Sequence, residues 1–385
     1  MRIARQTLNG LLSCCFARTD EFGTRMGRGV MRAASMAVTP VAPKLGRTLV
    51  LPGRYSRLQL VCDGIRRTPY GEPLRLRWPI LLSIAITNEC HSPCRNCYAA
   101  LGRGEDVKHL SLASPVWTEV CQSGIPTIGI TGGEPVNNPH LPELLASIAP
   151  LDKAVFVFTR DCTDRIIALA KRFGKRVTYV FSIYGGPDEH DRSRGRGNFA
   201  ATLDTARQVV SHGGRFAINA VVGDSDDGGL ASLAVRGTGL QPTKVMVTRL
   251  VSVGRGSHVA RVSLSTDDIR RLAGAVRSAL GCPVELHLPD LTGEQRRRSL
   301  SLGLRAAGLR YWSGCSVGKW AMHIDADGRY HECAFAESLP PVGADGIPLQ
   351  EAWQLLQSRH ARRADSCLVE AHRVVQQVQI TRGLT

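Results

Sequence analysis

A chain of 385 residues, of which 43% are hydrophobic, is long enough to fold as one large α/β domain with a smaller one beside it. It contains no uninterrupted apolar run of about 18 residues, which excludes a predicted transmembrane helix and a membrane partner. The formal net charge of +16 is unevenly distributed, because residues 1–75 hold 13 Lys and Arg against 4 Asp and Glu.

The N-terminal segment, residues 1–45, is rich in Arg, Ala and Gly and has no hydrophobic periodicity, so we expect it to be basic and flexible. Such charge can bind nucleic acid or acidic peptides, or it can simply be solvated. The absence of interleaved aromatic residues and of a nucleic-acid motif favours solvated arginines and no nucleic-acid partner. Residues 46–79 alternate polar and apolar positions and predict a strand-rich N-terminal extension.

Three cysteines follow the first predicted core strand. Cys90, Cys94 and Cys97 are separated by three and then two residues. A cubane iron-sulfur cluster has four irons, so three thiolates leave one iron open to another ligand. A zinc site would usually show a second Cys or Cys/His pair, and disulfide pairing would leave one thiol over. The spacing therefore predicts a [4Fe-4S] cluster with an open iron.

A glycine-rich turn follows the next predicted strand, residues 126–130. It reads Gly132, Gly133, Glu134 and Pro135. Two glycines let backbone groups approach a ligand closely, and a carboxylate can receive an ammonium group. A Gly-Gly turn alone is often only a turn, but its position one strand-helix unit after the cysteines predicts a ligand site.

Short apolar runs alternate with amphipathic segments from residue 80 onward. Six runs predict strands, at residues 80–86, 126–130, 154–158, 177–183, 216–222 and 244–250. Amphipathic helices are expected at residues 139–148, 164–173, 199–211 and 265–279. This alternation implies an α/β fold with a parallel sheet, whose functional groups collect at the C-terminal ends of the strands.

Two further cysteines lie near the C-terminus with a glycine between them. Twelve residues separate Cys315 from Gly328, and four more separate Gly328 from Cys333. Residues 324–330 predict two short strands joined by a turn at Asp327 and Gly328, which would bring the two thiols toward one another. Buried structural thiols are the alternative interpretation.

The cysteine loop and the Gly-Gly-Glu-Pro segment together resemble the motifs of the radical S-adenosylmethionine (SAM) superfamily. The resemblance implies a partial (β/α)6 barrel over residues 80–280, with SAM on the open iron and its amino group held by the Gly-Gly-Glu-Pro segment. Ser182 resembles a residue that contacts the ribose or carboxylate of SAM. Asn219 and Arg249 are expected to be polar residues at strand ends that could make similar contacts, and polar groups satisfied at the barrel rim are the alternative for all three. His190 and Asp191 are expected to tie down their loop.

The C-terminal pattern resembles the opening of a SPASM/twitch extension, which implies a small module over residues 281–385. Because only Cys367 follows, the resemblance implies one auxiliary iron-sulfur cluster, held by Cys315, Cys333 and Cys367. Its fourth ligand stays open among Cys282, His372, water and substrate.

The function implied by the resemblance is reductive cleavage of SAM to a 5′-deoxyadenosyl radical, which abstracts a substrate hydrogen. The electron would come from a donor such as flavodoxin or ferredoxin, and no side chain is assigned as catalytic. Peptide or protein maturation is the leading hypothesis. A tailoring dehydrogenase or decarboxylase for a sugar, nucleoside or antibiotic intermediate is the alternative, followed by a non-catalytic iron-sulfur scaffold. Cysteine use predicts a reducing cytoplasm.

Overall fold

The computed structural model describes residues 76–92, 94–99, 106–222, 227–236, 239–258, 266–288, 309–313, 317–318, 320–337 and 339–360. The predicted basic segment, most of the predicted N-terminal extension, Cys315, Cys367 and His372 lie outside these residues. Residues 76–79 precede the first strand and contain no strand themselves.

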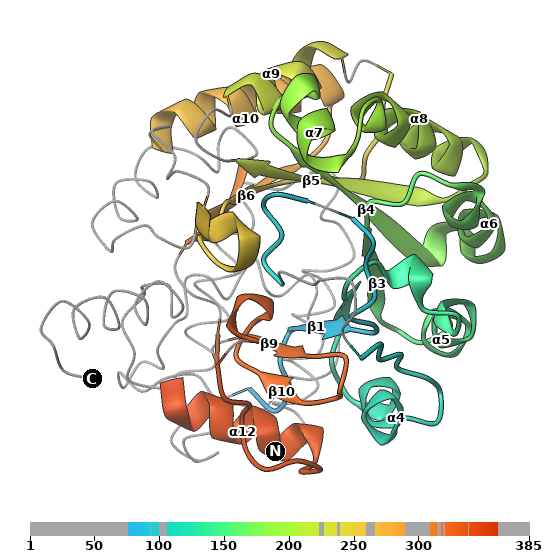
Figure 1. The fold of residues 1–385 in the computed structure, drawn as a ribbon, viewed down its shortest axis with the longest axis vertical. Helices are drawn as coiled ribbons and strands as arrows, with labels where there is room; N and C mark the ends of the chain where they lie inside the picture. The colour runs from blue at the N-terminus through green and yellow to red at the C-terminus, as the bar shows by residue number, and fades with distance from the viewer. Residues whose placement is uncertain are drawn as a thin grey trace, which may run out of the picture.

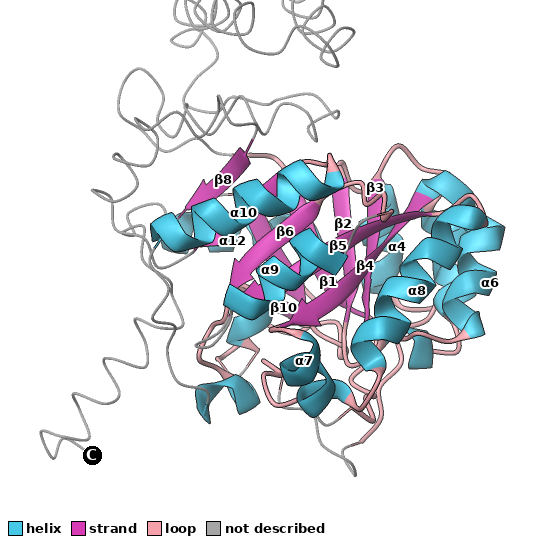
Figure 2. Ribbon diagram, turned by 90° about the horizontal axis from the view of Figure 1, so that it is seen from above, coloured by secondary structure: helices cyan, strands magenta, loops and turns pink. Residues whose placement is uncertain are grey.

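A single curved sheet forms the centre of the described part (Figures 1 and 2). Its order is β10-β9-β1-β2-β3-β4-β5-β6-β7-β8, and every neighbouring pair is parallel except β9 and β10. The strands are β1 (Leu81–Ala85), β2 (Thr127–Thr131), β3 (Ala154–Thr159), β4 (Val177–Tyr184), β5 (Arg215–Val222), β6 (Val245–Arg249), β7 (Val284–Leu288), β8 (Leu309–Ser313), β9 (Ala321–Ile324) and β10 (Tyr330–His331).

Helices cover the outer face of this sheet, as Figure 1 shows. The α-helices are α4 (Pro115–Gln122), α5 (Leu141–Ile148), α6 (Asp164–Phe173), α7 (Pro187–Arg194), α8 (Asn198–Ser211), α9 (Asp227–Arg236), α10 (Thr266–Leu280) and α12 (Leu349–His360). The 3-10 turns are η2 (Pro135–Asn137), η3 (Gly174–Arg176), η4 (Gly254–His258) and η5 (Ala334–Ala336). No helix among the described residues is long and apolar enough to cross a membrane.

Alternate residues of each strand face opposite sides of the sheet, and the two sides differ in what covers them. Leu82 and Ile84 of β1, like Ile128 and Ile130 of β2, are fully buried in the large core between the sheet and the helices. The residues between them face the other side, where β3 to β6 contribute a small second cluster. That cluster consists of Val180, Ala217 and Met246 with Phe156 and Phe158 packed against it. The inner face of the curved sheet is therefore distinct from the helix-covered core.

The predicted α/β fold and partial barrel are confirmed. All six predicted strands form in sequential parallel order, and the described sheet is open, because β8 and β10 are its two edges. The sheet is wider than the six predicted strands, with β7 and β8 at one edge and β9 and β10 at the other. The predicted C-terminal turn also forms, with Ile324 opposite Tyr330 and Gly328 at φ +84°.

The C-terminal segment extends the main sheet. Strand β9 runs parallel to β1, with Leu81 opposite Ala321. Helix α12 is anchored beside it, because the Trp353 indole and the Gln357 amide both donate to the carbonyl of Leu76, at 2.9 and 2.8 Å. The backbone N–H of Leu349 donates to the Glu119 carboxylate of α4 at 2.6 Å. The first and last described elements of the chain therefore lie together.

Candidate functional site

The cysteine loop, residues 88–99, follows the C-terminal end of β1. It crosses the inside of the curved sheet in Figure 1. The turn after β2 holds its first residues: the N–H of Gly133 donates to the Thr87 carbonyl at 2.7 Å, and the N–H of Glu134 donates to the Glu89 carbonyl at 2.8 Å. Two neighbouring strand ends therefore present the cysteines and Glu134 at the same edge of the sheet, as the sequence predicts.

The paired glycines have a structural role that the sequence did not indicate. A Cβ at Gly132, where φ is +140°, would lie 2.3 Å from the Thr87 carbonyl oxygen. A Cβ at Gly133 would lie 2.2 Å from the Glu89 carbonyl oxygen. Both positions therefore need glycine to seat the cysteine loop, and contact with a bound ligand stays a prediction for them and for Pro135, which begins η2.

The three thiols of the loop share one electrostatic neighbourhood. Burial raises the pKa of the Cys90 thiol, the backbone N–H of Ser92 lowers it, and the nearby charges of Cys94, Glu134 and Cys97 raise it further. The Cys94 thiol is buried and lies 2.8 Å from the Ser92 hydroxyl. A bound cation would stabilise the Cys90 thiolate, which this environment otherwise disfavours.

These residues fit an iron-sulfur cluster by the chemistry of their donors, since all seven cysteines of the described residues are free thiols. Across the described ranges, no group of three His, Cys, Asp or Glu side chains is already arranged around a single metal position. The thiols are neighbours on one loop, and their ligand role stays a prediction.

Glu134 is a buried carboxylate at the junction of β2 and β3. It is 6% exposed and accepts hydrogen bonds from the Thr159 hydroxyl at 2.7 Å, the N–H of Arg160 at 3.0 Å and the N–H of Val136 at 3.4 Å. Burial raises the pKa of Glu134, and these three hydrogen bonds partly oppose that rise. A carboxylate so fixed and so poorly solvated is suited to bind an ammonium group.

The three polar candidates on later strands occupy three neighbouring strands. Ser182 of β4 lies opposite Asn219 of β5, and both are inside their strands, so the prediction that Asn219 lies at a strand end is wrong. Arg249 is the last residue of β6, as predicted. The Thr248 hydroxyl donates to the Asn219 side-chain oxygen at 2.9 Å. Contact of Ser182, Asn219 and Arg249 with a ligand stays a prediction.

His190 and Asp191 hold their segment together, which confirms the prediction for them, although they lie in helix α7 and not in a loop. The N–H of Tyr184 donates to His190 Nδ1 at 3.1 Å, so the ring's Nε2–H donates to Asn198 Oδ1 at 2.9 Å. Asp191 accepts from the N–H groups that open α8. Burial and the charge of Arg194 lower the pKa of His190 to about 4.

Two contacts on the cysteine loop were not predicted from the sequence. Ser193 of α7 accepts a hydrogen bond from the N–H of Arg95 at 3.2 Å. Arg255 of η4 donates to the carbonyl of Cys94 at 2.8 Å. The available signal for Arg255 was its place between Gly254 and Gly256 directly after the sixth predicted strand.

The C-terminal segment reaches the same loop through aromatic packing. Tyr98, next to Cys97, packs edge-on against Phe335 of η5 with ring centroids 5.2 Å apart. The pKa of Tyr98 is raised by burial and then by the charges of Glu337, Cys97 and Cys333. Cys333, the residue before η5, therefore lies close to the cysteine loop. Cys282 instead packs in the large core just before β7.

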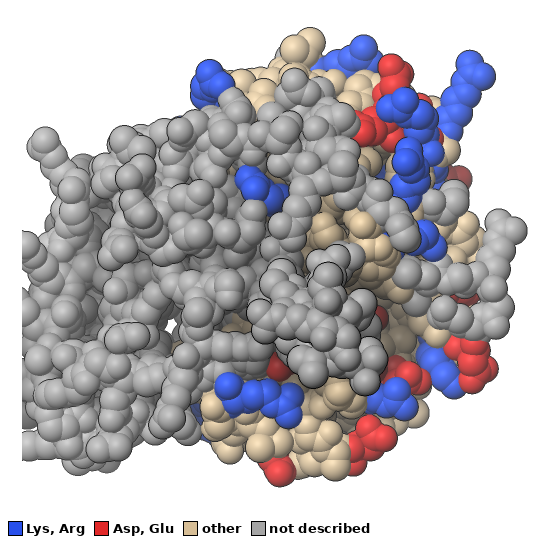
Figure 3. Space-filling model, turned by 60° about the vertical axis from the view of Figure 1, so that its left-hand side comes forward, with Lys and Arg blue, Asp and Glu red and all other residues tan. Residues whose placement is uncertain are grey.

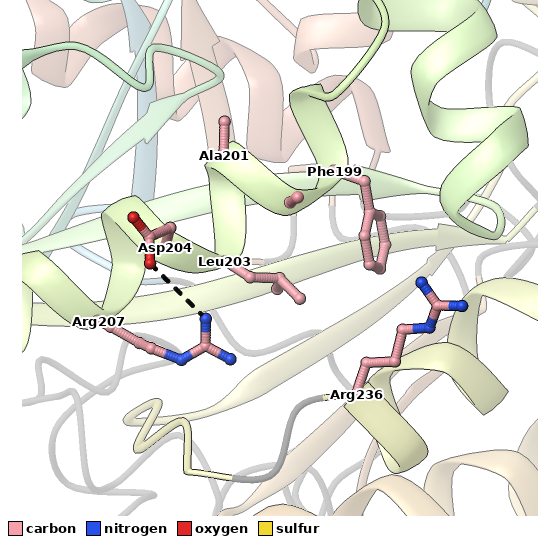
Figure 4. Close-up of a pocket in the computed structure, with 7 residues that line it drawn as sticks. Phe199, Ala201, Leu203, Asp204, Arg207 and Arg236 are labelled. Carbon is pink, nitrogen blue, oxygen red and sulfur yellow. Dashed lines mark ion pairs between the residues drawn. The ribbon is translucent and has the colours of Figure 1, made fainter.

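Other surface features lie apart from these residues. The pocket in Figure 4 measures about 490 Å³ and is lined by the start of α8 with Arg236 of α9, and it contains none of the predicted site residues. On the face in Figure 3, Lys and Arg side chains are interspersed with Asp and Glu.

Comparisons with known proteins give partial sequence matches and a shared fold. No protein-family model matches the chain. The sporulation killing factor maturation protein SkfB of Bacillus subtilis (strain 168) is 30% identical over 138 residues, which are 34% of this chain and 33% of SkfB. The antilisterial bacteriocin subtilosin biosynthesis protein AlbA of the same organism is 27% identical over 176 residues, 43% of this chain and 37% of AlbA. The matches thus span about a third of the length of each relative.

The fold is shared with Streptococcus suis SuiB. Its crystal structure bound to S-adenosylmethionine matches with a TM-score of 0.55 and 16% identity, covering 74% of this chain and 68% of SuiB. The structure of SuiB bound to precursor peptide SuiA matches with a TM-score of 0.56 and 15% identity, covering 79% and 70%. Together with the cysteine motif and the Gly-Gly-Glu-Pro turn, these comparisons give sequence similarity to SkfB and AlbA over part of the chain and a fold shared with SuiB.

Proposed function

We propose that the chain is a radical SAM enzyme that matures a peptide or protein. The observation that carries the proposal is the seating of the cysteine loop on the turn that bears Glu134. Two backbone hydrogen bonds and two glycines that admit no Cβ hold these motifs together at one edge of the sheet. Three thiols and a buried carboxylate are thereby fixed where a cluster and an amino acid cofactor can bind side by side.

Cys90, Cys94 and Cys97 are the proposed ligands of a [4Fe-4S] cluster. When bound, this cluster and SAM supply the radical that removes a hydrogen from the substrate. Cys315, Cys333 and Cys367 are proposed to hold one auxiliary cluster. The burial of Cys282 in the core before β7 argues against it as the fourth ligand.

The protein's own residues bind SAM and orient it. Glu134 receives the amino group of SAM, and the Gly132, Gly133 and Pro135 backbone shapes the turn around it. The inner face of the barrel offers Ser182 and Asn219 as polar contacts for SAM, with Asn219 oriented by the hydroxyl of Thr248, and the C-terminal end of β6 offers Arg249. The hydrogen abstraction needs no general base, so the barrel contributes orientation and exclusion of water.

A peptide substrate is supported by the names of the relatives. SkfB is a maturation protein, AlbA a bacteriocin biosynthesis protein, and SuiB has been crystallised with a precursor peptide. We propose the same class of substrate here. A flavodoxin or ferredoxin is the proposed electron donor, and a reducing cytoplasm is the proposed location, because it keeps the thiols available.

The test is anaerobic reconstitution of the full chain, followed by an assay for 5′-deoxyadenosine with dithionite as reductant. Short precursor-like peptides encoded beside the gene are the probes. The proposal expects 5′-deoxyadenosine from the wild type and a mass change in one peptide. It expects about 100-fold less of both from Glu134→Gln, and wild-type amounts of both from Glu143→Gln, an exposed carboxylate on α5. SAM cleavage with sugars or nucleosides but with no peptide modification would establish the tailoring alternative instead.

A further inference from the structure

The turn η4, which follows strand β6 in the chain, makes several hydrogen bonds to the cysteine loop. The backbone N–H of Arg255 donates to the Cys97 carbonyl at 2.9 Å. The Arg255 side chain donates from Nε to the Cys94 carbonyl at 2.8 Å and from Nη2 to the Ser92 carbonyl at 3.2 Å. Arg255 thus contacts the carbonyls of Ser92, Cys94 and Cys97, which lie some 160 positions earlier in the chain.

Gly254 makes this close approach possible. Its φ is +55°, and a Cβ there would lie 2.2 Å from the Tyr98 carbonyl oxygen and 2.5 Å from that of Cys97. The obstructing atoms are backbone, which cannot rotate away. Any other residue at this position would separate η4 from the loop. Figure 1 shows this turn, in gold, beside the loop.

The loop has few internal backbone hydrogen bonds. Among its described residues, 88–92 and 94–99, one such bond closes a turn, from the N–H of Cys97 to the Cys94 carbonyl at 3.3 Å. Its shape therefore depends on contacts from other elements. The Arg255 side chain supplies two such contacts, and its guanidinium holds the two carbonyls in a fixed geometry that an ammonium does not reproduce.

We infer that Gly254 and Arg255 form a brace that fixes the backbone of the cysteine loop, and that the charge of Arg255 favours reduction of the cluster bound there. Arg255 is a positioning residue, since it acts through the peptide groups of Ser92, Cys94 and Cys97. The second half of the inference rests on the proposed function. Reduction adds a negative charge to the cluster, and a nearby cation stabilises that state.

The brace is tested first on the full chain without iron, by hydrogen-deuterium exchange. Arg255→Gln removes the charge-assisted hydrogen bonds and should speed exchange in peptides covering residues 88–99 by about tenfold. Exchange in β3 to β5 should be unchanged. The control is Arg207→Gln on the surface of α8, which should leave the loop unaffected. If the loop of Arg255→Gln exchanged at the wild-type rate, the brace would be overturned. Faster exchange throughout the barrel would also overturn it, because that would mean general destabilisation.

The charge is tested on the reconstituted chain by redox titration of the SAM-binding cluster, followed by electron paramagnetic resonance. Arg255→Gln should shift the potential to more negative values. Arg255→Lys should restore the potential while still losing iron to a chelator faster than the wild type. An unchanged potential in Arg255→Gln would overturn the electrostatic role. If the wild type assembles no cluster, the proposed function fails while the exchange experiment still decides the brace.

Discussion

The barrel strands and the cysteine loop above them are stabilised in opposite ways. Strands β1 to β6 form from consecutive apolar runs and pair with their neighbours in chain order. The loop is held by hydrogen bonds from distant elements, made by Gly133 after β2, Ser193 of α7 and Arg255 of η4, and by the packing of Phe335 of η5 on Tyr98. The barrel therefore supplies stability, while the conformation of the loop depends on a few single contacts. Substitutions in the loop should therefore lower activity while the barrel stays folded, whereas substitutions in the barrel strands should lower the stability of the fold.

The largest effect is expected from replacing all three loop cysteines. The Cys90/Cys94/Cys97→Ala variant should lose about four irons per chain and all SAM cleavage. The apo-protein should still unfold near the wild-type temperature, because the strands do not depend on these thiols. Iron analysis, the 5′-deoxyadenosine assay and a thermal melt measure the three quantities. Retained SAM cleavage would contradict the ligand assignment.

The next largest effect is expected at Glu134. Glu134→Gln keeps the shape but removes the charge that binds an ammonium group, and should lower activity by about 100-fold. Burial raises the pKa of this carboxyl in the folded protein, so ionising it costs stability there. The apo wild type should therefore lose stability relative to Glu134→Gln as pH rises above about 4.5, the ordinary value. Denaturant melts from pH 4 to pH 8 measure this, and a constant difference would show that the carboxylate is not destabilised by burial.

A smaller effect, on stability, is expected at the glycine that seats the loop. Gly133→Ala places a Cβ 2.2 Å from the Glu89 carbonyl oxygen and should destabilise the loop by about 3 kcal/mol. Gly195→Ala is the matched control: its φ of +110° is strained, but nothing lies within 4 Å of a Cβ there. Its cost should be about 1 kcal/mol. Denaturant melts measure both losses, and equal losses of stability in the two variants would show that the close approach to the Glu89 carbonyl oxygen is not decisive.

The smallest effect is expected at His190. Its pKa falls from 6.5 to about 4 on folding, so the buried ring stays neutral and its contribution is lost as pH falls through that window. Stability should be about 2 kcal/mol lower at pH 5 than at pH 7 from this group. His190→Gln should have a flatter pH profile in the same melts, with the cysteine loop unchanged. An equally steep profile would assign the acid sensitivity to other groups.

The sequence predicted the parts of the molecule that have a local pattern. Helix α6 occupies the predicted residues 164–173, and the cysteine and Gly-Gly-Glu-Pro motifs lie at adjacent strand ends as expected. The pairing of strand β9 with β1 was missed, because the two strands are far apart in the chain and no local pattern indicates it. Arg255 was missed for the same reason, since its partners are remote peptide carbonyls that carry no sequence signal.

The most direct test of the central claim is electron paramagnetic resonance of the dithionite-reduced, reconstituted chain, recorded with and without SAM. Three thiolates leave one iron open, so SAM should change the signal of a reduced [4Fe-4S] cluster in the wild type. The Cys90/Cys94/Cys97→Ala variant should show no SAM-dependent signal. A fully loaded wild-type protein whose signal does not respond to SAM would contradict the account, because the cluster would then have no site open to the cofactor.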